Sequence, residues 1–159
     1  MSSKTLCVWV RIAVIAVALC GLVLCAYLIP LWGVDIATAN PEFENWYLPW
    51  LLFLWVVSLP CFSILIFVWK VSGAINREEV FSSKTARWIK ISAVLLFADV
   101  GLFFIGNLTF WLIGMNHPGI LLLSMLVDIF AIALAVLAAV LSRYITKAAV
   151  LQEENEGTI

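Results

Sequence analysis

Four long apolar runs constrain the fold of this 159-residue chain more than any other feature. They cover residues 12–31, 48–69, 91–113 and 120–141. Each has about the 20 residues with which a helix crosses a hydrocarbon core roughly 30 Å thick. Inside lipid a helix satisfies its own backbone hydrogen bonds. The runs therefore predict an all-α, polytopic membrane protein, with four transmembrane helices in an antiparallel bundle.

The composition excludes a water-soluble domain. Hydrophobic residues make up 65% of the chain, charged residues only 12%, and the mean hydropathy is +1.12. Such a chain has too little polar surface to cover a domain in water. A cleaved signal peptide is the alternative for the first run, since Lys4 and Arg11 resemble a basic leader region. The run is long and has no A-x-A-like cleavage site, so we expect a single membrane domain over residues 1–159.

The charges predict how the chain is oriented in the membrane. Basic residues occur only near the N-terminus, in the connection 70–90 and in the tail 142–159. The other two connections carry Asp35, Glu42 and Glu44 and no basic residue. By the positive-inside rule both termini and the loop 70–90 are cytoplasmic. Tryptophans near both predicted boundaries agree with this: Trp32, Trp46, Trp50 and Trp111 outside, Trp9, Trp69 and Trp88 inside.

Local signals refine the connections. Residues 32–46 are polar and acidic and predict a short exposed loop, with Pro41 breaking any helix. Pro60 lies near the middle of the second span and should kink it. Ser82 or Ser83 is expected to cap the third helix, and Gly119 to make a tight outer turn.

Three polar side chains fall within the predicted spans: Asp99, Asn107 and Asp128. Asp99 comes nine residues after Lys90, about 13 Å from the inner boundary at 1.5 Å per residue. Asn107 and Asp128 come to similar heights on neighbouring helices, so a hydrogen bond between them is expected. A charged aspartate at mid-bilayer costs about 2.5 to 3.5 kcal/mol, so both carboxyl groups should face other helices. They form either a proton relay or ion site, or neutral contacts between helices worth about 0.6 kcal/mol each.

Small and polar residues repeat along the fourth run at intervals of three and four. Such a stripe lets helices approach closely and predicts a packing seam within the bundle or a contact between copies. The stripe consists of Ser124, Asp128, Ala131, Ala135, Ala138 and Ser142.

Nothing in the sequence points to catalysis. It has no CxxC pair, phosphate loop, metal-ligand cluster or nucleophile-base pair, so we expect no enzyme, no cofactor and no direct binding of nucleic acid. The four cysteines fit small buried hydrophobes. His117 is interpreted as a turn residue, with sensing of external pH as the alternative.

Three segments together resemble the bacterial DUF2975 family of small four-span membrane proteins. They are "FSSKTARWIK", "GMNHPGILLL" and the ending "KAAVLQEENEGTI". The resemblance implies a multi-pass protein of the bacterial plasma membrane, with no established activity. Its members are often encoded beside a small helix-turn-helix protein of the Cro/CI type, which implies a regulatory partner. Gly157 stands where the family usually has leucine. This difference weakens the hypothesis that the tail docks through an apolar residue at that position.

Three functions follow as hypotheses. In the first, the loop 70–90 and the tail residues Glu153, Glu154, Asn155 and Glu156 hold a basic, cytosolic Cro/CI-type regulator by charge. In the second, Asp99 and Asp128 serve a small proton-coupled transporter or ion-conducting bundle, formed as a homo-oligomer. In the third, the chain is a non-catalytic interaction subunit of a membrane complex. Loop and tail can equally be solvated surfaces without a partner.

Overall fold

A computed structural model describes residues 2–77 and 79–156, with side chains as far as Glu154. Nearly all of these residues are helical, and four helical segments are long and apolar enough to span a membrane. The all-α fold with four antiparallel spans is thus confirmed. The elements are α1 (Ser3–Val23), the π-helical turn η1 (Leu24–Leu28), α2 (Ile29–Ala39), the 3₁₀ helix η2 (Pro41–Trp46), α3 (Tyr47–Asn76), α4 (Ser83–Leu112) and α5 (Pro118–Glu156).

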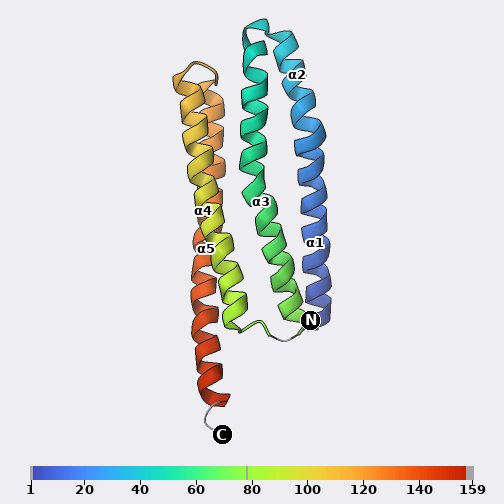
Figure 1. Ribbon diagram of the computed structural model, residues 1–159, viewed down its shortest axis with the longest axis vertical. Coiled ribbons are helices and arrows are strands. Elements are labelled where there is room, and N and C mark those ends of the chain that lie inside the picture. Colours follow the sequence, from blue (N-terminus) through green and yellow to red (C-terminus); the bar gives the residue numbers. More distant parts are fainter. Residues whose placement is uncertain (1, 78, 157–159) are drawn as a thin grey trace.

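The helices stand side by side in chain order (Figure 1). Helix α1 packs on α3, α3 on α4, and α4 on α5. Within the described residues α5 makes no close backbone contact with α1 or α3, so the helices form an open row. Most large apolar side chains are exposed, as expected where lipid covers the outside of the helices.

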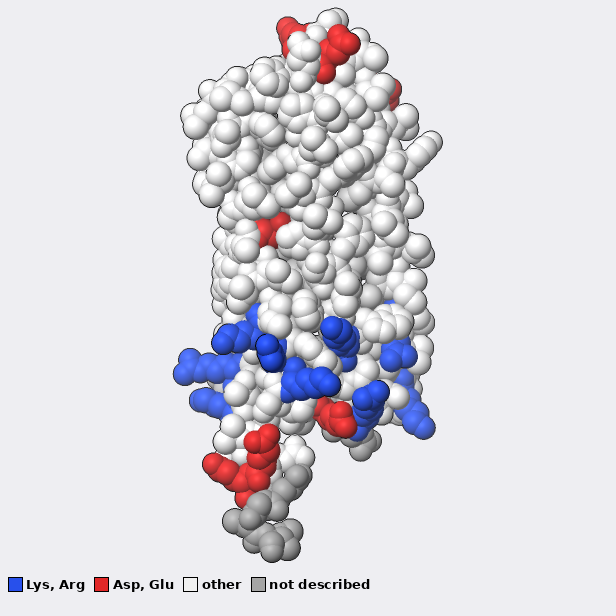
Figure 2. Space-filling model, in the orientation of Figure 1, with Lys and Arg blue, Asp and Glu red and all other residues white. Residues whose placement is uncertain are grey.

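The charges lie at the two ends of the row (Figure 2). Lysine and arginine side chains form a band near the start of α1 and the 77–82 connection, at the end that we call the basic end. The opposite end, called the far end, contains η2 and the 113–117 turn and carries acidic side chains. A broad band almost without charge separates them, as a bilayer requires. That the basic end faces the cytoplasm remains a prediction from the positive-inside rule.

The predicted exposed loop over 32–46 is wrong. Helix α2 continues to Ala39, and η2 covers Pro41 to Trp46. The helical run is interrupted only at Asn40, whose backbone angles of φ −134° and ψ 87° are not helical. Acidic residues are compatible with a helix, and no proline occurs between Pro30 and Pro41 to break it.

A proline explains the π-helical turn between α1 and α2. The N–H of Ile29 bonds the carbonyl of Leu24, five residues back. In this register the carbonyl of Cys25 would accept from residue 30, but Pro30 has no N–H. The indole Nε1–H of Trp55 donates to that carbonyl instead, at 3.0 Å. This bond accounts for a tryptophan in the middle of a span and ties α3 to η1.

Two further local predictions have different outcomes. Ser82 is confirmed as the cap of α4, because its side chain accepts the Thr85 N–H at 3.3 Å. The turn at Gly119 is wrong, since Gly119 lies in the first turn of α5. The chain reverses at Gly114, whose φ of +77° suits only glycine well, and Pro118 begins the next helix.

Helix α3 continues through Pro60 to Asn76, and its axis changes direction near the middle (Figure 1), as expected of a proline kink.

At the basic end, Arg11 Nε of α1 donates to Ser72 Oγ of α3 at 3.2 Å. The same Ser72 oxygen lies 3.3 Å from Cys7 Sγ. These contacts hold α1 against α3.

Candidate functional site: carboxyl groups between membrane-spanning helices

Asp99 lies on α4 at its contact with α3 and is 7% exposed. Cys61 Sγ of α3 donates a hydrogen bond to Asp99 Oδ2 at 3.4 Å. Asp99 Oδ1 is buried and has no hydrogen-bond partner in the described part of the chain. Ser63, two residues further along α3, donates its hydroxyl to the Leu59 carbonyl of its own helix at 2.9 Å. The carboxyl group therefore has only a weak thiol donor.

Asp128 lies on α5, is 6% exposed, and its Oδ2 is buried with no partner among the residues that the structure describes. It is close enough to Asp99 for the two carboxyl groups to interact electrostatically. No lysine, arginine or histidine among the described residues bonds either group. The structure thus gathers two aspartates that are 29 positions apart, from neighbouring helices, into one acidic site.

The expected hydrogen bond between Asn107 and Asp128 is absent from the described structure. Asn107 Nδ2 donates to the Phe103 carbonyl of its own helix at 2.9 Å. Asn107 Oδ1 accepts from Asn116 Nδ2 at 3.2 Å. The turn after α4 brings Asn116 back to within hydrogen-bond distance of Asn107. Asn107 therefore belongs to the far end and not to the acidic site.

Sequence reasoning missed Cys61 and Asn116. The interpretation of the cysteines as buried hydrophobes overlooks that a thiol within a span is also one of the few donors available there. The sequence pattern assigns Asn116 no role. The signal that could have found it is its position nine residues after Asn107, with a turn between them.

The small-residue stripe on α5 is the seam against α4. Ser124, Asp128, Ala135 and Ser142 are buried, while Ala131 and Ala138 are half-buried. Ser142 Oγ crosses the seam and donates to the Ala86 carbonyl at 2.8 Å. The predicted packing seam within the chain is confirmed, and it holds Asp128 between two helices.

The predicted tail is a continuation of α5. The whole of α5 has 39 residues and is about 58 Å long, nearly twice the thickness of the hydrocarbon core. Glu153 and Glu154 are exposed, and the side chains of Asn155 and Glu156 lie outside the described residues, as does Gly157. Helices also cover most of the predicted loop 70–90, leaving only residues 77–82 between α3 and α4.

No group of three or more possible metal ligands occurs in the part of the chain that the structure describes. The free cysteines make no disulfide among the described residues. The acidic site therefore contains carboxyl oxygens and one thiol, a set that can hold or pass protons.

A family model described as "Protein of unknown function (DUF2975)" matches residues 31–159. The chain belongs to the DUF2975 family. The "Uncharacterized membrane protein YoaS" of Bacillus subtilis (strain 168) is 24% identical over 157 residues, covering 96% of each chain. No solved structure matches this DUF2975 member. Both descriptions agree with a membrane protein, and neither names an activity.

Proposed function

We propose that this DUF2975 member is a regulatory protein of the bacterial plasma membrane that binds a basic cytosolic protein through the end of α5. The partner suggested by the family resemblance is a Cro/CI-type helix-turn-helix regulator. One observation carries the proposal: α5 continues past the band of basic side chains and ends in acidic ones (Figure 2). Both termini are cytoplasmic in this proposal.

Two properties of this helix end favour a basic partner. The last turn of α5 contains acidic residues and no basic one, at the negative end of the helix dipole. Cations are favoured at this end of a helix. Leu151, one turn earlier, is 60% exposed and offers an apolar contact beside the charges. Apolar anchors flanked by charges are common in interfaces that depend on electrostatic complementarity.

Deleting residues 152–159 is expected to reduce retention of the cytosolic partner at least tenfold. The deletion removes the acidic end of α5 and leaves the apolar run 120–141 intact, so insertion should be unchanged. Full-length and shortened proteins would be captured from native membranes after mild crosslinking, and the captured proteins identified by mass spectrometry. The double variant Glu153→Gln, Glu154→Gln should weaken retention too, and added salt should weaken it for the intact chain.

The matched control is Glu42→Gln with Glu44→Gln, which removes two acidic charges at the far end. It should leave retention unchanged. Equal retention by the intact and shortened chains would contradict the proposal. Capture of membrane proteins alone would favour an interaction subunit of a membrane complex.

The acidic site supports a second candidate function, proton-coupled transport or ion conduction. Asp99 and Asp128 are buried, interact electrostatically and have no basic partner among the described residues. Buried carboxyl groups in a membrane are costly and commonly mark proton or ion paths. Because the four helices form an open row, a conducting path would require a homo-oligomer.

In this second function, Asp99→Asn or Asp128→Asn is expected to leave expression intact and reduce proton flux at least tenfold. Asparagine keeps the size of the side chain but does not exchange a proton near neutral pH. Flux would be measured with a pH-sensitive dye inside vesicles containing the purified protein. Asp35→Asn, an exposed position on α2, is the control. Folded variants with unchanged flux would exclude the transport function.

A further inference from the structure

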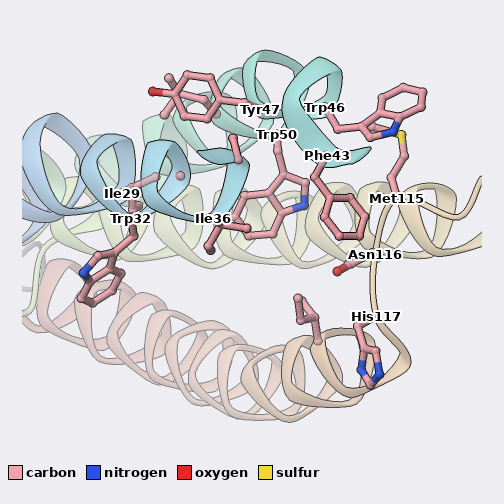
Figure 3. A pocket seen from close by; sticks show the side chains of 14 residues that line it. Ile29, Trp32, Ile36, Phe43, Trp46, Tyr47, Trp50, Met115, Asn116 and His117 are labelled. Carbon is pink, nitrogen blue, oxygen red and sulfur yellow. The ribbon is translucent and has the colours of Figure 1, made fainter. Parts of the chain in front are cut away.

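A cavity of about 360 Å³ opens at the far end of the molecule. It lies between α2, η2 and the start of α3 on one side and the 113–117 turn with the start of α5 on the other (Figure 3). The space exists because α2 and α5 make no close backbone contact in the described structure. Its volume falls within the range of small-molecule sites.

The walls of this cavity are mainly apolar and aromatic. Figure 3 shows the Trp50 and Phe43 side chains directed into the space, with Ile36 beside them. Trp32 and Met115 also line it. Tryptophans predicted to lie at the outer membrane boundary place the cavity where the chain of an amphiphile can enter from the bilayer.

Asn116 adds a polar group to this apolar cavity. It is 9% exposed, lines the cavity, and its side chain points toward the space below Phe43 (Figure 3). Its Nδ2 donates to Asn107 Oδ1 at 3.2 Å, whereas its Oδ1 is buried and has no partner within the described residues. A buried carbonyl oxygen without a donor is unfavourable. A ligand that donates a hydrogen bond would complete the site.

The charges around the cavity restrict the ligand further. The far end carries Asp35, Glu42 and Glu44 and, apart from His117 at the rim, no residue that can be cationic. An anionic head group would meet a negative surface there. An uncharged or cationic head group would not.

We propose that the cavity binds an amphiphile with one alkyl chain, whose uncharged or cationic head group donates a hydrogen bond to Asn116 Oδ1. The chain occupies the space lined by Trp50, Phe43 and Ile36. Monoacylglycerols and long-chain alcohols have this chemistry. The inference concerns the far end of the molecule and does not depend on the tail of α5.

Photoaffinity labelling of the full-length protein in vesicles tests this site. The probe is a monoacylglycerol with a diazirine in its chain, competed with unlabelled monoacylglycerol or with the fatty acid of the same length. We expect saturable labelling of peptides from residues 29–51 and 115–120. The fatty acid should compete at least tenfold more weakly than the monoacylglycerol.

Two variants separate binding from folding. Ala37→Phe fills the cavity and should reduce saturable labelling at least tenfold, whereas Ala139→Phe, on the exposed surface of α5, should not. Asn116→Leu removes the acceptor and should make monoacylglycerol compete about tenfold more weakly, with circular dichroism checking that it folds. Labelling that does not saturate, that survives Ala37→Phe, or that the fatty acid competes equally would overturn the proposal.

Mass spectrometry of lipids that copurify with the wild type and with Ala37→Phe identifies the source of the ligand. A lipid of this chemistry lost from the variant would assign the bilayer as the source. Saturable labelling without such a lipid would support the same site and assign a ligand from outside the membrane.

Discussion

Replacing Gly106 with alanine is expected to destabilise the protein by about 1 to 3 kcal/mol, the usual cost of overpacking a core. A Cβ atom on Gly106 would overlap the ring of Phe53 on α3. That ring cannot easily move aside. It is stacked on Phe103, with 6.1 Å between centroids, and meets Phe110 edge-on at 5.2 Å.

The matched control is Gly101→Ala on the same helix, where an added Cβ meets nothing within 4 Å. Alanine is favoured over glycine within a helix by about 0.5 to 1 kcal/mol, so this variant should be neutral or slightly more stable. Thermal unfolding of both variants in the same detergent provides the comparison. Equal stability of the two would show that Phe53 does not require a glycine at position 106.

Replacing Asp128 with leucine is expected to raise the stability by about 1 to 3 kcal/mol, the usual desolvation cost of an unpaired buried polar group. Asp128 Oδ2 is buried and has no hydrogen-bond partner among the described residues. Leucine removes this unpaired polar group and places an apolar side chain within the membrane. A residue that lowers stability where it stands is typical of a functional site.

Unfolding in detergent and in lipid would measure this gain. Asp35→Leu, on the exposed surface of α2, should change the stability by less than about 0.5 kcal/mol, as surface substitutions usually do. If Asp128 served instead as a contact between helices, leucine would lower the stability by about 0.6 kcal/mol. The sign of the change therefore separates the functional interpretation from the packing one.

The candidate site was only partly predictable from the sequence. Asp99 and Asp128 stand out because any carboxyl group in an apolar run is unusual. Their mutual proximity and the thiol of Cys61 depend on how far each helix is rotated and shifted along its neighbour. Apolar positions hardly restrict that rotation in a membrane, because lipid and neighbouring helices are similarly apolar.

The predictions for the connections between helices were wrong for a different reason. Polar, acidic residues between two spans are typical of loops, yet α2 continues to Ala39 because no residue before Asn40 breaks the helix. Gly114 and Gly119 flank the same turn, and either can occupy a left-handed position. Pro118 begins α5, so the left-handed residue must precede it, and Gly114 is the glycine on that side.

The membrane class, the four helices, their antiparallel order and the separation of charges were all predictable from the amino-acid sequence. These depend on properties of single segments: apolar length, backbone hydrogen bonds within each helix, and charges that stay out of lipid. The packing of the helices adds three features: an open row, two aspartates from distant parts of the sequence near enough to interact electrostatically, and a cavity with Asn116 at its wall at the far end. Those features depend on the shapes of facing side chains such as Phe53 at Gly106, which no single segment specifies.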